Sequence, residues 1–156
     1  MVGDTHMPRG GRRLPAACLR VLRDAAVVVH TGDLTSAAVL AELARLAGVE
    51  EVHAVLGNMD GHDLRGVLPE RRVVEAEGLR IGLVHDGGPR AGRHERLAGW
   101  FPGCDLVAYG HTHEPELARH GDLWVVNPGS PTERRRAPGH TMAVVRDGVP
   151  ELVPLD

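Results

Sequence analysis

Hydrophobic residues in the first part of the chain alternate between a helical and an extended spacing. Arg12–Asp24 places apolar side chains three and four positions apart, which predicts an amphipathic helix. Ala25–His30 and Val52–Leu56 are short β-branched runs, typical of buried parallel strands. Between them, Ser36–Ala47 is rich in Ala and Leu and predicts a second helix. Its first residue is the expected N-cap, and Gly48 is the expected C-terminal stop.

The second part of the chain is mostly strand-like, with short apolar segments that turn back at glycines. One further helix is predicted at Arg93–Trp100, and one short buried strand at Leu106–Tyr109. Three hairpins are predicted, formed by Arg72–Glu77 with Arg80–Val84, Glu116–His120 with Leu123–Val126, and Thr141–Arg146 with Pro150–Val153. Alternating α and β segments followed by β segments predict an α/β sandwich, and we expect residues 1–156 to form a single domain.

Composition excludes several classes of protein. The chain has 156 residues, 42% of them hydrophobic, and a net charge of −3, which argues against a stable nucleic-acid partner. No apolar stretch approaches the roughly 18 residues of a membrane span, and no apolar leader precedes Asp4. Cys18 and Cys104 are too few for a disulfide framework and are expected in the core. We therefore expect a cytoplasmic protein without a membrane partner.

Polar clusters follow the predicted strands at the points where these strands end. In α/β sheets, ligands bind beyond the carboxyl ends of the strands, where glycines let the backbone turn sharply. The first cluster fits this rule only if a strand precedes it. The clusters are Asp4-Thr5-His6, Gly32-Asp33, Gly57-Asn58, His85-Asp86-Gly87-Gly88 and Gly110-His111-Thr112-His113.

The side chains in these clusters are those of a metal site. Carboxylate, amide and imidazole donors suit Mn²⁺, which we place first, and also Fe²⁺, Co²⁺, Ni²⁺ and Zn²⁺. Two pairs with a spacing of two residues, Asp4 with His6 and His111 with His113, face one side in extended geometry. With Asp33, Asn58 and His85 they give more ligands than one ion can use while admitting a substrate. The sequence therefore predicts two divalent ions that share a bridging carboxylate.

Each cluster alone has a plain structural explanation. Asp4-Thr5-His6 resembles a surface turn, Gly57-Asn58 is common turn chemistry, and a single His85 is most often a hydrogen-bonded structural residue. Gly110-His111-Thr112-His113 is the strongest single piece. Their occurrence in this order after successive strands is what favours a functional site.

The ordered motifs resemble those of the calcineurin-like metallophosphoesterase superfamily. The resemblance runs from Gly3 to about Ser130, and the combined set is very specific. The short chain and the ending Asn-Pro-Gly-Ser resemble the small single-domain phosphodiesterases of bacteria and archaea, a branch related to the metallophosphoesterase-like subunit of retromer. The motifs are Gly3-Asp4-Thr5-His6, Gly32-Asp33, Gly57-Asn58-Met59-Asp60, His85, Gly110-His111-Thr112-His113 and Asn127-Pro128-Gly129-Ser130.

This resemblance implies a four-layer α/β/β/α sandwich of two mixed sheets flanked by helices, with a dinuclear site at one edge. The implied activity is hydrolysis of a small phosphate ester, most often a diester, by a water or hydroxide that attacks phosphorus in line. Relatives often form dimers or tetramers. The implied ligands are Asp4, His6 and His113 for one ion, Asn58, His85 and His111 for the other, and Asp33 as the bridge. Asp33, Asn58, Asp60 and His85 are expected to serve catalysis, Asp60 by orienting a ligand.

The chain departs from the family pattern at two positions. Met59 stands where many members carry a His that protonates the leaving group or binds the phosphate, although the short branch commonly lacks it. Asp86 stands where relatives often have Gly, and we favour a turn residue there over an added carboxylate at the site.

Two alternatives to this picture stay open. For the three arginines at 134–136 we favour a solvated loop over substrate contact, although the arginine fork suits phosphate. The alternative to an enzyme is a catalytically weak scaffold for protein–protein interaction, but the intact ligand set favours the enzyme. The substrate, the native metal and the oligomeric state are not determined by the sequence.

Overall fold

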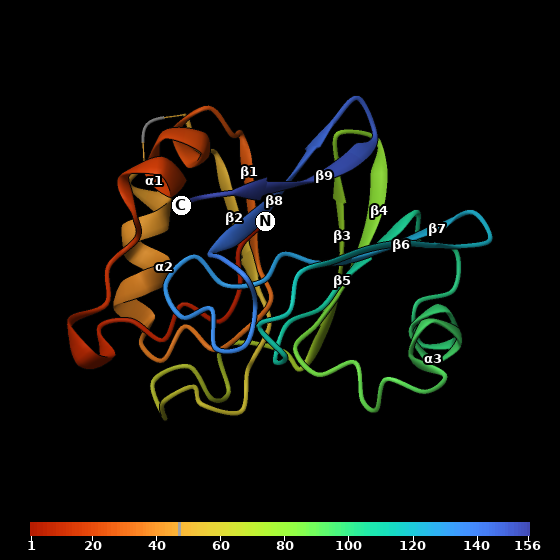
Figure 1. Ribbon diagram of the computed structural model, residues 1–156, viewed down its shortest axis with the longest axis horizontal. Coiled ribbons are helices and arrows are strands. Elements are labelled where there is room, and N and C mark those ends of the chain that lie inside the picture. The colour runs from red at the N-terminus through yellow and green to blue at the C-terminus, as the bar shows by residue number, and fades with distance from the viewer. Residues whose placement is uncertain (47) are drawn as a thin grey trace.

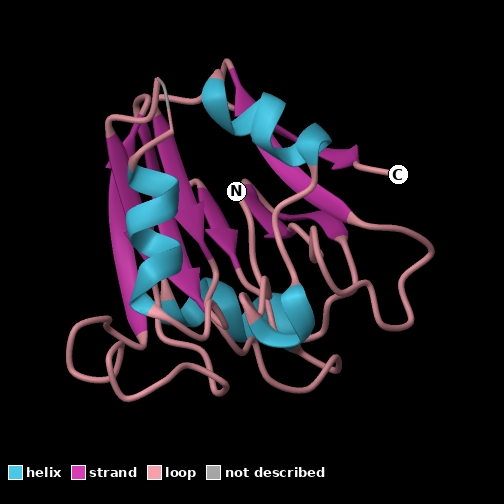
Figure 2. Cartoon of the chain, turned by 90° about the vertical axis from the view of Figure 1, so that its left-hand side faces the viewer, coloured by secondary structure: helices cyan, strands magenta, loops and turns pink. Residues whose placement is uncertain are grey.

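The structure is a computed structural model that describes residues 1–46 and 48–156. Two β-layers face each other and helices cover both outer sides, with α1 and α2 on one side and α3 on the other (Figures 1 and 2). The helices are a 3-10 turn η1 (Arg9–Gly11), α1 (Ala16–Arg23), α2 (Ala37–Ala44) and α3 (Arg93–Trp100). The strands are β1 (Val27–His30), β2 (Glu51–Ala54), β3 (Arg71–Ala76), β4 (Leu79–Val84), β5 (Leu106–Ala108), β6 (Glu116–His120), β7 (Leu123–Asn127), β8 (Thr141–Arg146) and β9 (Val149–Pro154).

The N-terminal residues connect two strand pairs into the first β-layer. β1 and β2 are parallel, whereas β8 and β9 form an antiparallel hairpin. Val2 forms a parallel bridge with His30, and the N-terminal amine donates to the Ala143 carbonyl at 2.7 Å. The segment before Asp4 therefore forms a single bridge at Val2, between β1 and β8.

The second β-layer is a five-stranded mixed sheet with the order β3-β4-β5-β7-β6. Its centre, β4-β5-β7, is parallel, and the two outer pairs are antiparallel hairpins. The hairpin β3–β4 turns at Glu77 and Gly78, which both have left-handed backbone. All three predicted hairpins are confirmed, and so is the sandwich of two mixed layers flanked by helices.

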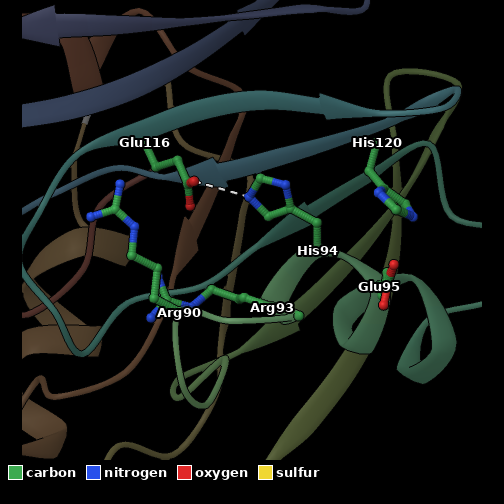
Figure 3. A pocket seen from close by; sticks show the side chains of 7 residues that line it. Arg90, Arg93, His94, Glu95, Glu116 and His120 are labelled. Carbon is green, nitrogen blue, oxygen red and sulfur yellow. Dashed lines mark hydrogen bonds and ion pairs between the residues drawn. The ribbon is translucent and has the colours of Figure 1, made fainter.

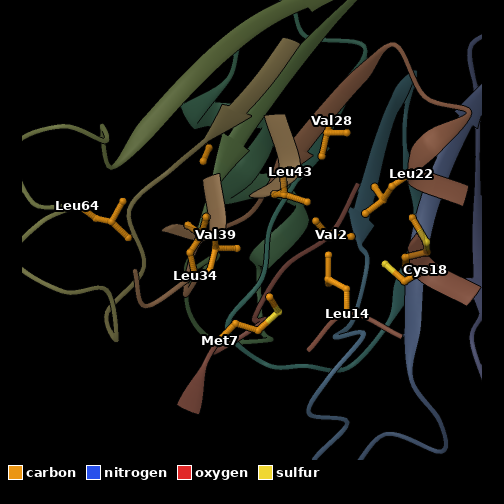
Figure 4. Packing of buried hydrophobic residues seen from close by; sticks show 12 residues of the cluster. Val2, Met7, Leu14, Cys18, Leu22, Val28, Leu34, Val39, Leu43 and Leu64 are labelled. Atoms are coloured by element: carbon orange, nitrogen blue, oxygen red, sulfur yellow. The ribbon is translucent and has the colours of Figure 1, made fainter. Parts of the chain in front are cut away.

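Three apolar clusters fill the spaces between the four layers. Alternate residues of one strand point to opposite sides, so that Val28 packs under α1 and α2 while Val29 packs between the β-layers. The cluster under α1 and α2 includes Cys18, Leu22 and Leu43 (Figure 4). The third cluster lies between the five-stranded sheet and α3. Because β1, β4 and β5 contribute to the clusters on both sides, the strand ends that carry the polar motifs are firmly held.

Boundaries of the first elements differ from the prediction for identifiable reasons. The first helix begins at Ala16 rather than Arg12, because a residue that precedes proline, here Leu14 before Pro15, disfavours helical backbone. Leu14 is nevertheless buried. The second helix ends at Ala44, and its predicted last residue, Ala47, lies outside the described residues.

Three further predictions concern element lengths, the two cysteines and membrane spans. β1 and β2 are each shorter than predicted, whereas α3 spans Arg93–Trp100 as predicted. Both cysteines are free; Cys18 is buried and Cys104 is partly exposed. Within the described part of the chain, no helix has the length and apolar character needed to cross a membrane.

Replacing Ser36 by Ala should lower the free energy of unfolding by about 1 kcal/mol, measured by urea denaturation. The Ser36 hydroxyl accepts the Ala38 N–H at 3.2 Å, as predicted for an N-cap. The matched Ser36→Asp variant keeps an acceptor and should retain most of the stability. An equal loss in both variants would show that the cap contributes nothing.

Candidate metal centre

All seven predicted ligands lie in loops that follow strands of the two β-layers. The loops after β1, β2, β4 and β5, together with the segment after Val2, gather at one edge of the sandwich, drawn lowest in Figure 1. The backbone holds these loops together, because Asp4 N donates to the Gly32 carbonyl at 3.0 Å and Gly110 N donates to the His85 carbonyl at 2.9 Å. Five segments that are distant in sequence therefore meet at this edge.

Asp4, His6 and His113 form the first cluster of donors. The Nε2 atoms of His6 and His113 lie 3.3 Å apart, and His113 Nε2 is 3.5 Å from Asp4 Oδ1. One donor atom from each of the three residues lies within 4.8 Å of the others. Two imidazole nitrogens at this distance, beside a carboxylate, form an arrangement that suits a shared cation.

Asn58, His85 and His111 form the second cluster. The Asn58 Oδ1 atom lies 2.9 Å from His85 Nε2 and 3.0 Å from His111 Nδ1. On its other side, His85 Nδ1 donates to the Thr31 carbonyl at 2.8 Å, which directs Nε2 toward the cluster. An amide oxygen and two imidazole nitrogens therefore converge at one place.

Asp33 lies between the two clusters. Its Oδ2 atom is 3.5 Å from His6 Nε2 and 3.5 Å from His85 Nε2. Its Oδ1 atom accepts the Met59 N–H at 2.7 Å. This is the position that a bridging ligand would need. Asp4 also approaches the second cluster, because Asp4, Asp33 and His85 offer donor atoms within 4.8 Å of one another.

Most of the predicted ligands have a strained backbone conformation. Left-handed backbone in a residue other than glycine costs of order 1–3 kcal/mol and persists where the surroundings enforce it, often at functional sites. Nothing in the sequence indicates this conformation for these residues. It occurs at Asp4 (φ 52°), His6 (φ 46°), Asp33 (φ 58°), His111 (φ 71°) and His113 (φ 60°).

Glycines next to the ligands leave space that a side chain would fill. A Cβ atom at Gly57 would collide with the backbone and carboxylate of Asp33. A Cβ atom at Gly110 would come within 2.8 Å of Asp4 Oδ2. The motif glycines are therefore explained by the close approach of neighbouring ligand loops.

Within the described residues, no arginine side chain forms an ion pair with Asp4 or Asp33, the two buried carboxylates of the site. Asp4 is completely buried, and its carboxylate accepts the His111 N–H at 3.0 Å. Burial raises the pKa of Asp4 to about 7, and the charge of Asp33 adds to this. Burial also acts to raise the pKa of Asp33, but the neighbouring His85 ring and the Met59 N–H outweigh it and lower that pKa.

Burial favours the neutral, metal-binding form of two of the site's imidazoles, those of His6 and His113. Burial lowers the pKa of His113 to about 4 and also lowers the pKa of His6. Burial acts in the same direction on His85, but the Asp33 and Asp4 carboxylates outweigh it and raise its pKa. A divalent cation would pair with the buried carboxylates and accept the imidazole lone pairs. The donor set therefore fits divalent ions.

Asp60 contacts the site through the backbone rather than through a ligand side chain. Its carboxylate accepts N–H groups from Gly57 at 2.6 Å, Thr35 at 2.7 Å and Asp33 at 3.2 Å. These bonds fix the loops that carry Asp33 and Asn58. His30 is completely buried, accepts the Gly32 N–H and contacts the Thr5 hydroxyl.

Residues 127–133 contact the ligand loops in a way that sequence reasoning did not assign. Ser130 Oγ donates to the Asp4 carbonyl at 2.8 Å, and Asn127 Nδ2 donates to the Gly110 carbonyl at 3.2 Å. The Glu133 carboxylate lies 3.8 Å from His6 Nε2. The Asn-Pro-Gly-Ser motif was part of the family resemblance and was the signal in the sequence for this segment. The sequence does not show which ligand loops the motif contacts, because those contacts depend on the fold.

Asp86 and His62 are polar residues close in sequence to the predicted ligands. Asp86 Oδ1 accepts the Gly88 N–H at 2.7 Å, so this carboxylate closes a local turn, as favoured. His62 is exposed. Neither side chain belongs to the two donor clusters.

A cleft of about 340 Å³ begins at the second cluster and leads away from it. Asn58 and His85 of this cluster are among its lining residues. Its lining is Leu56, Gly57, Asn58, Arg65, Glu70, Arg71, Val84, His85 and Asp86.

A second cleft, of about 390 Å³, lies between α3 and β6 and contains none of the predicted ligands. His94 and Glu116 face each other across it at 2.9 Å, and His120 lies farther along (Figure 3). Arg93 links it to the metal edge, donating to the Gly88 carbonyl and the Tyr109 hydroxyl. His94 and His120 are partly exposed.

Known proteins are similar to this chain in sequence and in fold. A family model described as the calcineurin-like phosphoesterase superfamily domain matches residues 1–147. A protein of Methanothermobacter thermautotrophicus named "Probable metallophosphoesterase" is 38% identical over 151 residues, which is 95% of this chain and 85% of that protein. A phosphodiesterase of Methanocaldococcus jannaschii is 28% identical over 119 residues, 65% of each chain.

Among solved structures, wild-type Vps29 of Entamoeba histolytica complexed with Zn²⁺ superposes with a TM-score of 0.72. It is 26% identical, and the match covers 99% of this chain and 97% of that one. The similarity in sequence and the similarity in structure therefore both extend over almost the whole of this chain.

Proposed function

This chain belongs to the calcineurin-like phosphoesterase superfamily, and we propose that it is a metal-dependent phosphodiesterase with a dinuclear site. The observation that carries the proposal is the position of Asp33, whose Oδ2 atom is 3.5 Å from a histidine of each donor cluster. The name of the phosphodiesterase relative supports diesters as the substrate class.

The residues divide into two sets that share one carboxylate. Asp4, His6 and His113 would hold one ion, and Asn58, His85 and His111 the other, with Asp33 bridging them. When bound, such a pair of ions stabilises the phosphoryl oxygens electrostatically and lowers the pKa of the attacking water. Mn²⁺ is the ion we place first, with Fe²⁺, Co²⁺, Ni²⁺ and Zn²⁺ as alternatives.

The protein's own contribution is orientation. The Thr31 carbonyl fixes the ring of His85, and the N–H of Met59 fixes the carboxylate of Asp33. Asp60 acts as a positioning residue, because its three N–H bonds hold the loops of Asp33 and Asn58 in place. Ligands fixed before the substrate arrives need no reorganisation during the reaction.

The test is hydrolysis by chelator-stripped protein with Mn²⁺, Ni²⁺, Co²⁺ and Zn²⁺ added back singly. Bis-p-nitrophenyl phosphate and p-nitrophenyl phosphate are compared at equal concentration. We expect metal-restored turnover that is stronger on the diester. Tight metal binding without turnover on either ester would instead support the protein-interaction scaffold.

Met59→His should preserve turnover on p-nitrophenyl esters and raise it on diphenyl phosphate, whose leaving group needs a proton. The Met59 side chain is 37% exposed, and its contact to Asp33 is made by the backbone, so a His fits without disturbing the site. General acid catalysis contributes roughly 10²–10⁴-fold where it operates, which sets the upper limit of the gain.

The control for this prediction is Met59→Leu, which keeps the size of the side chain and adds no acid. It should match the wild type on both esters. A large loss of turnover in both variants would show that the Met59 side chain shapes the pocket. It would contradict the prediction that a general acid at this position raises turnover.

A further inference from the structure

The loop of residues 130–137 is joined to the ligand loops at several points. Thr132 Oγ1 donates to the Thr5 carbonyl at 2.7 Å, and the His113 ring bonds to the Glu133 carbonyl. With the bond from Ser130 to Asp4, these contacts fix the loop against the first and last ligand segments. A side chain on this loop therefore has a defined position relative to the donor clusters.

Three consecutive arginines on this loop have different surroundings. Arg135 Nη1 lies 3.5 Å from the carbonyl of His111, which places its guanidinium at the rim of the metal edge. Arg134 instead donates to Ala137 within the loop, at 2.9 Å. Arg136 is exposed, and in the described part of the chain it has no hydrogen bond to a ligand loop. Among the three arginines, all in the described part of the chain, Arg135 is the one whose side chain contacts a ligand loop.

The backbone and charges around Arg135 support the same conclusion. Its φ angle of 48° is left-handed, a conformation that arginine rarely adopts without constraint. The nearby Glu133 carboxylate is paired with Arg12 at 2.9 Å.

We propose that Arg135 binds the phosphoryl oxygens of the substrate at the metal edge. The guanidinium has five N–H donors, and the contact to His111 uses one, which leaves donors for a bidentate bond to an anion. This role rests on the proposed phosphodiesterase function.

The test is binding of inorganic phosphate to the Mn²⁺-loaded protein, measured by calorimetry. Arg135→Gln should weaken phosphate binding about 10- to 100-fold, the range expected for charged hydrogen bonds, and raise the KM for bis-p-nitrophenyl phosphate similarly. Mn²⁺ affinity and Tm should not change. Arg and Gln are equally disfavoured in left-handed backbone, so this substitution should not change the conformation of the loop.

Arg134→Gln is the matched control, since it removes the same charge from the same loop and should leave phosphate binding unchanged. Arg135→Lys should recover part of the affinity, because it keeps the charge and loses the fork. Unchanged phosphate binding in an Arg135→Gln protein that still turns over diesters would overturn the role of Arg135 alone. Equal losses of phosphate affinity in both glutamine variants would also overturn it, because they would show a long-range effect of charge rather than direct contact by Arg135.

A wild-type protein that binds Mn²⁺ but neither binds phosphate nor hydrolyses diesters would overturn both this role and the proposed function. The two failures are therefore distinguishable, because calorimetry reports phosphate binding even in the absence of turnover.

Discussion

Asp33→Ala is expected to abolish diester hydrolysis and to reduce binding of both metal ions, because it removes the carboxylate that lies 3.5 Å from a histidine of each cluster. Loss of several kcal/mol of transition-state stabilisation corresponds to a fall in kcat/KM of roughly 10³-fold or more. Turnover and metal content of the purified variant are measured together. Full activity in this variant would contradict a shared ligand.

Two further variants separate this effect from a folding defect. Asp33 has a left-handed φ of 58°, which Asn tolerates better than Ala, so Asp33→Asn keeps the backbone and one acceptor for the Met59 N–H. It should lose metal and activity as Asp33→Ala does. Asp122→Ala removes an exposed carboxylate from the turn between β6 and β7 and should behave as wild type.

Metal loading is expected to raise the Tm by about 5–10 °C when Mn²⁺ is present at about 100 times its Kd. Binding to the folded state alone then adds about 2.7 kcal/mol, and a chain of this size gains roughly 2–4 °C per kcal/mol. The stabilisation arises because a cation offsets the cost of burying two carboxylates, Asp4 and Asp33, which are only 0% and 2% exposed. Scanning calorimetry with and without chelator measures the shift.

The matched comparison for this prediction uses the same variants. Asp33→Asn should show little or no Mn²⁺-dependent shift, and Asp122→Ala should show the full shift. A wild-type Tm that does not respond to any of the divalent ions would mean that the buried carboxylates do not bind a cation.

The sequence predicted the features that depend on residue type and spacing. β-branched runs followed by Gly-Asp, Gly-Asn and Gly-His placed the donors at strand ends, and the fold brings those ends to one edge. The three hairpins and α3 were predicted because glycine turns and helical spacing are local signals. Prediction was less accurate at Ala16, where a proline delays the helix that apolar spacing alone would begin earlier.

Other features depend on contacts between distant segments and could not be predicted. Asp4 and His113 have left-handed backbone, and each is hydrogen-bonded to the loop of residues 130–137. Asp60 was expected to orient a ligand, but its contacts are with backbone N–H groups, which no spacing reveals. The three arginines were interpreted together as a solvated loop, and only the fold separates Arg135 from its neighbours.

The measurement that tests the dinuclear site most directly is the number of ions bound per chain. Chelator-stripped wild-type protein is titrated with Mn²⁺, and bound metal is quantified by elemental analysis after removal of free ion. Two ions per chain, falling toward zero in Asp33→Asn, is the result predicted by one carboxylate between two donor clusters. One ion per chain in the wild type, or two ions retained in Asp33→Asn, would contradict it.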